Sequence, residues 1–183
     1  MKIIQLDTNI ILYQIQLSDA EDIFYAIDSQ RNYLGTWLPF VEFTKSIDDT
    51  KAFINSVINP LSGNEEFVFV IHYNQQFAGL AGFNHTDMVN RRAAIGYWLC
   101  QQFQGKGIMT KVVTALCNFA FTELHINRIQ INCAINNSPS NKIPRKLGFT
   151  FEGIERDGEL LSNGQFTDIA VYSKLFKDWC KEQ

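Results

Sequence analysis

Apolar residues recur at helical spacing in some parts of the chain and in short strand-like runs in others. The order of these two patterns predicts the order of helices and strands. Toward the N-terminus, apolar residues recur at helical intervals after polar start signals. A capping-box spacing at Ser18–Glu21 predicts one helix, and Ser46 followed by two aspartates predicts a second helix that runs to about Val57. We expect residues 59–64, which contain Asn-Pro and Ser-Gly-Asn, to end this second helix in a turn.

Three apolar runs follow and predict three successive strands, at residues 67–71, 77–83 and 93–99. The first two runs are separated by a short polar turn at 74–76, which is typical of an antiparallel hairpin. We therefore expect an antiparallel meander in the middle of the chain.

The second half of the chain predicts a crossover between parallel strands. Residues 105–124 place their apolar side chains on one stripe of a helix, and residues 128–135 alternate strictly between apolar and polar. A strand, a helix and a strand in this order form a crossover unit, whose two strands run parallel. A short helix at 140–147 and two closing strands, at 149–153 and 166–172, complete the expected mixed α/β sheet with helices on its faces.

Composition predicts a single domain over residues 1–183 and narrows the classes of partner. With 46% hydrophobic and 19% charged residues, the chain can bury one core. A net charge of -3 and a pI near 5.6 are not typical of a protein that binds a polyanion, so we expect no direct nucleic-acid partner. No apolar run is long enough to span a membrane and no signal sequence is evident, so we expect a cytoplasmic protein without a membrane partner.

Four cysteines, at positions 100, 117, 133 and 180, lack both C-x-x-C pairing and a neighbouring histidine cluster. We therefore expect mostly buried free thiols rather than a zinc site or a disulfide framework, and no metal. The sequence leaves a homodimer open.

The stretch QQFQGKGIMT, residues 101–110, places two glycines directly before the long helical pattern. The first N–H groups of a helix have no partner within the helix and carry partial positive charge. Glycine lets the backbone approach an anion closely, because no Cβ stands between them. The pattern therefore indicates a phosphate-binding loop, with an ordinary loop glycine as the alternative. The spacing fits neither a Walker loop nor the three-glycine dinucleotide fingerprint.

Three ordered motifs carry a resemblance to one enzyme family. Gln102–Gly107 has the form Q-x-x-G-x-G, residues 90–99 form the strand pattern before it, and residues 137–149 contain an asparagine, a serine three positions later and a closing Leu-Gly-Phe. These motifs resemble those of the GNAT acetyltransferases, in particular the RimJ/RimL-like branch of ribosomal-protein N-acetyltransferases. Residues 33–38 and 166–168 also look like this branch, so that the resemblance covers nearly the whole chain.

The resemblance implies the GNAT acyl-CoA N-acyltransferase fold, a mixed and mostly antiparallel sheet in which two parallel strands splay apart. The implied cofactor is acetyl-CoA, whose pantetheine arm would pair with the splayed strands while the loop amides hold its pyrophosphate. Trp98 and Leu99 would offer backbone groups to the arm, and Lys106 would either reach a phosphate or lie in solvent. The predicted cofactor-binding residues are Trp98, Leu99, Gln102, Gln104, Gly105, Lys106, Gly107, Ile108, Met109 and Asn141.

By the same resemblance, the catalytic residues would be Ser140, which protonates the departing thiolate, and Asn137, which holds the cofactor or an ordered water. Each has a structural alternative, because Ser140 stands where a helix N-cap belongs and Asn137 could be part of a turn. Capping and catalysis are compatible, since a hydroxyl can accept one hydrogen bond while it donates its proton elsewhere.

One position departs from the family pattern: Ala94 stands where related sequences often have a glutamate that deprotonates the incoming amine. Near pH 7.5 roughly a third of an α-amine with a pKa of about 7.7 to 8.0 is already neutral, against about 0.1% of lysine with a pKa of about 10.4. We therefore expect the acceptor to be the N-terminal α-amine of a protein, a ribosomal one by the resemblance, unless His85, Asp87 or a water chain replaces the base.

Two other functions stay open from the sequence. The acceptor could be a small amine such as a polyamine or an aminoglycoside, which the acidic residues at 48–49, 65–66 and 87 would favour. The missing glutamate at position 94 also leaves room for a non-catalytic CoA-binding module.

We expect the acceptor pocket at the first two helices and the loop between them, where residues 37–40 cluster. The predicted acceptor-binding residues are Trp37, His85, Tyr97 and Asp168. For His85 the alternative is a solvent-facing loop histidine, and for Asp168 it is a role in fixing a strand.

Overall fold

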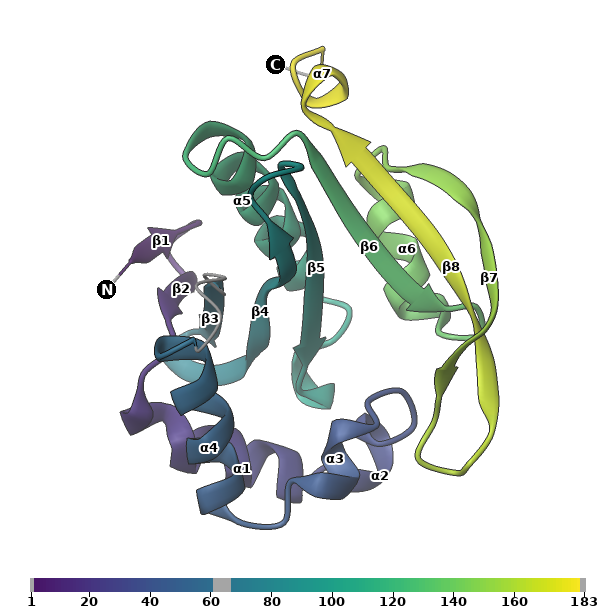
Figure 1. Ribbon diagram of the computed structural model, residues 1–183. Coiled ribbons are helices and arrows are strands. Elements are labelled where there is room, and N and C mark those ends of the chain that lie inside the picture. Colours follow the sequence, from purple (N-terminus) through teal and green to yellow (C-terminus); the bar gives the residue numbers. More distant parts are fainter. Residues whose placement is uncertain (1, 61–66, 182–183) are drawn as a thin grey trace.

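The computed structural model describes residues 2–60 and 67–181, so that the turn predicted at 62–64 lies outside the described residues. The described residues form a sheet of eight strands in the order β1-β2-β3-β4-β5-β6-β8-β7 (Figure 1). Neighbouring strands are antiparallel except β5 and β6, which run parallel. The strands are β1 (Ile3–Gln5), β2 (Ile10–Gln14), β3 (Phe67–Tyr73), β4 (Gln76–Asp87), β5 (Arg92–Leu99), β6 (Arg128–Ala134), β7 (Thr150–Leu160) and β8 (Phe166–Leu175). The helices are α1 (Ala20–Asp28), α2 (Arg31–Leu34), α3 (Phe40–Phe43), α4 (Ile47–Ile58), α5 (Ile108–Thr122), α6 (Ser138–Lys146) and α7 (Phe176–Trp179).

Two short N-terminal strands, β1 and β2, are not predicted by the hydrophobic pattern, because a tight turn interrupts it. The Asp7 carboxylate accepts hydrogen bonds from the N–H groups of Asn9 and Ile10, both at 2.8 Å, and fixes this turn. In β2 only Ile10 and Leu12 are buried, on one face. Two buried positions are too short a signal for a strand.

The two predicted N-terminal helices are present, but only one begins as expected. Ser46 is the N-cap of α4: its hydroxyl accepts from the N–H of Asp49 at 3.3 Å, and the Asp49 carboxylate accepts from the N–H of Ser46 at 2.8 Å. The capping box predicted at residues 18–21 is wrong. The Asp19 carboxylate instead accepts from the N–H of Gln16 at 2.7 Å, so that a short 3-10 turn leads into α1.

The predicted meander and the predicted parallel pair are both confirmed. Asn74 and Gln75 form the tight turn between β3 and β4 with positive φ angles of 50° and 65°. β5 and β6 then pair over only three residues of each strand, from Arg92 to Ala94 on β5. In Figure 1 the two strands separate toward the end of the sheet that lies near α2 and α3.

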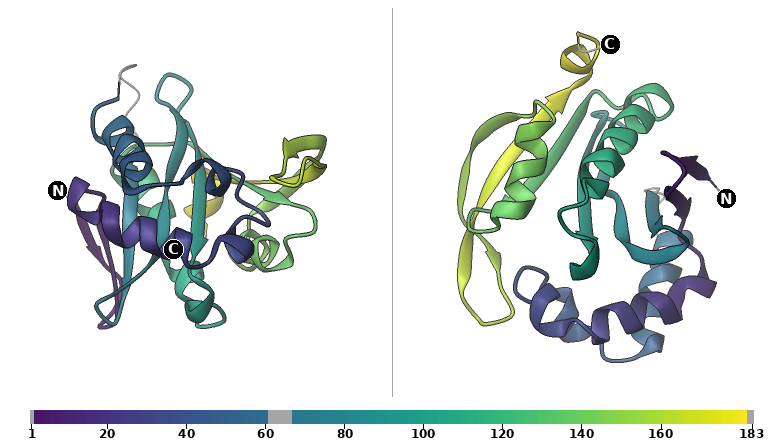
Figure 2. Two further views of the ribbon diagram at one scale, coloured as in Figure 1. Left: turned by 90° about the horizontal axis from the view of Figure 1, so that it is seen from below. Right: turned by 180° about the vertical axis from the view of Figure 1, so that it is seen from behind.

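The helices α5 and α6 lie on the same face of the sheet, as the right-hand view of Figure 2 shows. α5 contacts β4 and β5, whereas α6 contacts β6, β7 and β8. α1 packs on α4 and also contacts β4. None of the helices among the described residues is long and apolar enough to cross a membrane.

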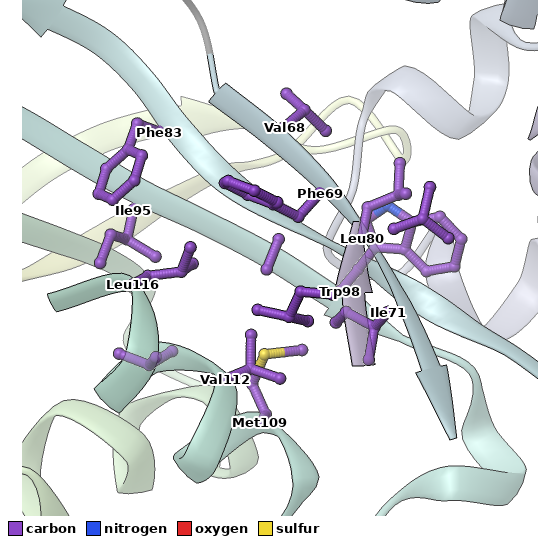
Figure 3. Close-up of a cluster of buried hydrophobic side chains, with 14 of the residues drawn as sticks. Val68, Phe69, Ile71, Leu80, Phe83, Ile95, Trp98, Met109, Val112 and Leu116 are labelled. Atoms are coloured by element: carbon purple, nitrogen blue, oxygen red, sulfur yellow. The ribbon is translucent and has the colours of Figure 1, made fainter. Parts of the chain in front are cut away.

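Alternation along the strands divides the core into two faces. The rings of Phe69 and Phe83 contact Phe119 of α5, with centroids 5.9 and 6.2 Å apart. Figure 3 shows the same layer, in which strand side chains pack against the α5 residues Met109, Val112 and Leu116. The intervening strand positions, including Val68 and Leu80, point to the face that α1 and α4 cover. Each face of β5 therefore adjoins a different set of helices.

Candidate active site

The separation of β5 from β6 leaves backbone groups of β5 without a neighbouring strand. The N–H of Cys100 donates to the C=O of Ala78 in β4, at 2.8 Å, whereas the C=O of Arg91 accepts from the N–H of Arg128 at the start of β6, at 3.1 Å. Because backbone groups of successive residues alternate in direction, Tyr97 and Leu99 direct their N–H and C=O groups into the gap. A ligand that lies in the gap can therefore pair with β5 as an added strand would.

This alternation changes the role expected of Trp98. Its backbone points toward β4, in register with Leu80, so Trp98 contributes its side chain to the site rather than backbone groups. The C=O of Leu99 accepts a hydrogen bond from the Tyr33 hydroxyl at 3.2 Å. The backbone of Tyr97 is thus better placed than that of Trp98 to bind an extended ligand.

The glycine loop lies at the end of this gap, at the start of α5. Gly105 and Gly107 both have a φ angle of 73°, and no atom lies within 4 Å of the position that a Cβ would occupy at either residue. Gly107 is the N-cap of α5, and no side chain among the described residues caps the helix. The first amides of a helix of 15 residues therefore adjoin open space, and this arrangement fits a pyrophosphate group.

The gap, the glycine loop and α6 enclose a cavity of about 560 Å³, which we call the cofactor cavity. Its wall brings together many of the predicted residues: Trp37, Tyr97, Trp98, Leu99, Gln104, Gly105, Gly107, Ile108, Met109, Asn137 and Ser140. It also includes residues that lie within the quoted motifs but were not predicted to bind the cofactor: Tyr33, Leu34, Leu38, Phe103, Thr110, Pro139, Lys142 and Ile143.

Three predicted cofactor residues do not line this cavity. Gln102 is exposed in the short 3-10 turn before the loop. The Lys106 ammonium lies 5.2 and 5.3 Å from the ring centroids of Phe103 and Tyr73, a cation–π arrangement. Asn141 is 4% exposed, and its amide donates to the C=O groups of Ala134 and Asn137, both at 2.8 Å. Asn141 therefore fixes the turn before α6.

The two predicted catalytic residues lie together at the start of α6. The Asn137 side chain accepts from the N–H of Ser140 at 3.3 Å, so Asn137 is the N-cap of α6 and Ser140 is not. The Ser140 hydroxyl lies 3.3 Å from the Tyr97 hydroxyl and 3.1 Å from the Cys133 sulfur. Because capping does not occupy it, the Ser140 hydroxyl can take part in proton transfer.

Burial determines the protonation states around Ser140. Desolvation raises the pKa of Tyr97 far above its usual value, with a further contribution from the nearby Cys133. Desolvation also raises the pKa of the Cys133 thiol. Both groups are therefore protonated near neutral pH, and the site presents hydroxyl and thiol donors rather than anions.

A second cavity of about 420 Å³ lies on the other face of β5, and we call it the acceptor cavity. It shares Leu38, Tyr97 and Trp98 with the cofactor cavity. Its remaining lining is Ile23, Ile27, Pro39, Phe40, Thr44, Thr50, Phe53, Val68, Leu80, Ala81, Gly82, Asn84, Gly96 and Glu159. The loop at 37–40 contributes as expected, except that Trp37 lines the cofactor cavity and not this one.

Glu159 is the carboxylate in the wall of the acceptor cavity, and the motifs did not indicate it. It comes from β7, where the pairing with β8 shifts between Glu155 and Glu159. Desolvation raises the pKa of Glu159 above its usual value. A half-buried carboxylate with a raised pKa is suited to accept a proton from an amine. The irregular register explains why alternation along the strand could not place it.

Of the remaining predicted acceptor residues, Asp168 does not line either cavity. The Asp168 carboxylate accepts from the N–H of Asp157 at 2.9 Å, where Asp157 has a positive φ angle of 51°. Asp168 therefore fixes the irregular stretch of β7 that leads to Glu159. This is the structural role that the sequence left open as an alternative to acceptor binding. His85 lies within β4 rather than in a loop, and its side chain lies outside the part of the structure that is described.

The cysteines follow the expectation for buried thiols in three cases: Cys100, Cys117 and Cys133 are buried, whereas Cys180 is exposed. Within residues 2–60 and 67–181, no group of three or more His, Cys, Asp or Glu side chains is arranged to hold a metal ion.

Comparison with known proteins agrees with this geometry. Residues 9–150 match the family model described as "Acetyltransferase (GNAT) domain". A Bacillus subtilis (strain 168) protein with the name "Putative ribosomal N-acetyltransferase YdaF" is 34% identical over 179 residues, which cover 96% of each chain.

Two solved structures share the fold over nearly the whole chain. RimL, a ribosomal L7/L12 alpha-N-protein acetyltransferase in complex with coenzyme A, matches with a TM-score of 0.89 and 26% identity over 97% of this chain and 99% of its own. The microcin C7 self-immunity acetyltransferase MccE, in complex with acetyl-CoA and AMP, matches with a TM-score of 0.87 and 31% identity over 94% and 95%.

Proposed function

Since the chain belongs to the GNAT acetyltransferase family and is an acetyl-CoA-dependent N-acetyltransferase, we propose that its acceptor is the N-terminal α-amine of a protein. One observation carries this proposal: a mostly apolar cavity, in which Glu159 is the one carboxylate among the described lining residues, meets the cofactor cavity at Tyr97 and Trp98. The relatives named as ribosomal acetyltransferases support a ribosomal protein as the acceptor.

The cofactor cavity positions one substrate. Acetyl-CoA supplies an activated acetyl group as a thioester when it is bound. The amides at Gly105–Met109 bind its pyrophosphate, and the backbone of Tyr97 pairs with its extended arm. Holding the thioester next to the shared wall lowers the barrier by several kcal/mol, because the amine and the acetyl group no longer have to find each other.

Glu159 acts on the incoming amine. It accepts a proton from the α-ammonium and so produces the neutral nucleophile. The raised pKa of Glu159 brings it closer to that of an α-amine, which makes this proton transfer easier than it would be for an exposed glutamate. Glu159 thus replaces the carboxylate that is missing at Ala94, and it comes from a different strand. The non-catalytic CoA-binding module was considered because position 94 lacks a glutamate, and a base at Glu159 removes this reason.

Ser140 acts on the departing sulfur. The Ser140 hydroxyl would donate its proton to the departing thiolate, and the proton that the nitrogen loses as it becomes an amide would restore the hydroxyl. The Tyr97 hydroxyl accepts from the Ser140 hydroxyl at 3.3 Å and donates to the Ser140 C=O, so that it holds Ser140 in position. Asn137 contributes by holding the first turn of α6 in place, through its bond to the N–H of Ser140. In this scheme protons enter from the acceptor face at Glu159 and leave on the cofactor face at Ser140.

A small amine is the second candidate, because an Escherichia coli (strain K12) relative that is 27% identical over 152 residues has the name "Spermidine N(1)-acetyltransferase". A polyamine fits this chain less well, since several cationic groups would face only one carboxylate in the described wall. Asp49 caps α4, Asp48 pairs with Lys51, and Asp87 pairs with Arg92, so none of them lines the cavity. Residues 65–66 lie outside the described residues.

A panel of acceptors tests the proposal. CoA release would be measured with peptides that carry a free N-terminus, with the same peptides blocked at the N-terminus but containing lysine, and with spermidine. We expect activity with the free N-terminus and little with the other two. Activity confined to spermidine or to lysine would overturn the proposal. The cytoplasmic location, the homodimer and the lack of nucleic-acid or membrane partners stay predictions from the sequence.

A further inference from the structure

Asn84 contributes an exposed carboxamide to the wall of the acceptor cavity. It lies on β4, in register with Ala94 of β5. The carboxamide has no hydrogen-bond partner among the described residues. Other strand positions in the same wall, such as Val68 and Leu80, have apolar side chains. Asn84 therefore presents free polar atoms on a largely apolar surface.

Gly96 determines where this carboxamide lies. A Cβ added at Gly96 would be 2.5 Å from Nδ2 and 3.7 Å from Oδ1 of Asn84, and the three atoms nearest to it all belong to Asn84. The side chain thus lies over the backbone of β5 at Gly96, with Nδ2 nearer to the strand than Oδ1. Gly96 lines the acceptor cavity and directly precedes Tyr97, where the two cavities meet. The carboxamide is therefore close to the place where the amine meets the thioester.

Few side-chain oxygens in the described wall are free to accept a hydrogen bond from an amine. The Thr44 hydroxyl donates to a backbone C=O at 3.1 Å, and the Thr50 hydroxyl is fully enclosed. The Tyr97 hydroxyl bonds to the start of α6. Asn84 and Glu159 remain, and both have side-chain oxygens without a partner among the described residues. Glu159 acts as the base, so Asn84 is the second acceptor.

The hydrogens of the incoming α-ammonium show what a second acceptor would do. One of the three passes to Glu159, and the lone pair that this frees attacks the thioester carbon. A second hydrogen is lost as the nitrogen becomes an amide. The third stays on the nitrogen as the N–H of the product. A group that binds this third hydrogen holds the nitrogen in one orientation throughout and takes no part in proton transfer.

We propose that Asn84 Oδ1 accepts a hydrogen bond from this third hydrogen and thereby directs the lone pair at the thioester carbon. This inference rests on the proposed function, because it assigns a second contact to the amine that Glu159 deprotonates. A neutral amide suits the task, since a carboxylate in its place would favour the ammonium form, which cannot attack. An N-methylated amine has no third hydrogen and gains nothing from Asn84.

The test compares two peptides that differ only at the α-nitrogen: one begins with alanine and the other with N-methylalanine. The measured quantity is kcat/KM for each peptide, with the unmodified protein and with Asn84→Ala. Asn84→Ala should lower the value about tenfold for the alanine peptide, mainly through kcat, and about twofold at most for the methylated one. Differences in reactivity between the two amines cancel, because each peptide is compared with itself.

Two further variants separate amine binding from a structural role. Asn84→Asp retains an acceptor oxygen and should keep most of the preference for the alanine peptide. Asn132→Ala is the matched control, because Asn132 is an exposed asparagine on β6 that lines neither cavity. It should leave kcat/KM for both peptides unchanged.

The outcomes distinguish this inference from the proposed function. If Asn84→Ala slows both peptides equally, or slows neither, Asn84 does not hold the amine, while N-terminal acetylation stands. A loss of the preference in Asn132→Ala would contradict the assignment to Asn84 in the same way. If neither peptide is acetylated but spermidine is, the proposed function fails and the inference falls with it.

Discussion

The two cavities on either side of β5 differ in the kind of atoms that form them. The cofactor cavity depends on backbone groups, namely the amides at Gly105–Met109 and the unpaired edge of β5. The acceptor cavity is formed largely by side chains from segments far apart in the sequence, from Ile23 to Glu159. Backbone groups suit a cofactor that many enzymes share, whereas side chains can vary from one enzyme to another. The binding of the cofactor is therefore separate from the choice of acceptor.

The strongest test of this division is Gly107→Val. A β-branched residue at a φ angle of 73° is strained, and its Cβ would occupy the space beside the loop amides. Losing two hydrogen bonds to a charged group, each worth about 2 kcal/mol, weakens acetyl-CoA binding by about a thousandfold. Calorimetric titration with acetyl-CoA measures this loss.

Gly164→Val supplies the control, because Gly164 has a similar φ angle of 77° but lies in the β7–β8 turn. It should reduce stability without changing the affinity for acetyl-CoA. If both variants lose acetyl-CoA binding equally, the effect of Gly107 is one of folding and not of anion binding.

Glu159→Gln should affect the other cavity. We expect kcat/KM for a peptide acceptor to fall about a hundredfold near pH 7, because the general base is lost, while acetyl-CoA binds as before. The activity of the unmodified enzyme should fall as the pH is lowered, because Glu159 becomes protonated. Since the pKa of Glu159 is raised, this fall should occur at a higher pH than it would with an exposed glutamate as the base. The variant should lack this fall.

The exposed Glu155, on the same strand, gives a matched variant. Glu155→Gln should keep both the activity and its pH dependence. An unchanged pH–rate profile in Glu159→Gln would exclude Glu159 as the base.

Ser140→Ala tests the cofactor side of the same reaction. We expect turnover to fall about thirtyfold, with little change in acetyl-CoA affinity, because the proton donor to sulfur is removed and the protonated Tyr97 nearby replaces it in part. Single-turnover kinetics of CoA release measures the effect. Ser138→Ala, at the exposed first residue of α6, should react normally. Normal turnover in Ser140→Ala would remove Ser140 from the mechanism.

The smallest effect is expected away from both cavities, at Glu152. Its carboxylate accepts two hydrogen bonds from Arg128, one at 2.6 Å, and one from the Ser173 hydroxyl at 2.7 Å. These bonds lower the pKa of Glu152 to about 2. A lowered pKa means that the stabilisation is present above the unfolded value near 4.5 and is lost as the pH falls toward 2.

Because Arg128 and Glu152 are partly exposed, the ion pair should contribute only about 0.5 to 1 kcal/mol at pH 7. Urea unfolding of Glu152→Gln should show this loss at pH 7 and a smaller difference from the unmodified protein at pH 3. A difference that stays constant between these pH values would contradict the assignment to ionisation. Catalysis should not change.

Much of the backbone-built region could be predicted from the sequence. The glycine loop, the long helix after it and the parallel pair of strands all depend on local patterns, because glycine positions and apolar spacing act within a few residues. Ser46 likewise begins α4, as predicted. The N-terminal strands were missed because a turn fixed by Asp7 divides a short hydrophobic signal.

Less of the side-chain-built region could be predicted. Glu159 reaches the cavity only because β7 shifts its register against β8, and a shift of this kind leaves no periodic trace. Asn141 stands in a cofactor motif but supports the turn before α6 through its amide.

The three-residue pairing of β5 with β6 has a consequence for the lifetime of the protein. Unpaired strand edges usually lie at the margins of a sheet, where they invite association with other chains. Here such an edge lies in the interior of the sheet, where it lines the cofactor cavity. Bound acetyl-CoA would therefore complete the sheet. At a concentration one hundred times its dissociation constant, it would raise the free energy of unfolding by about 2.7 kcal/mol.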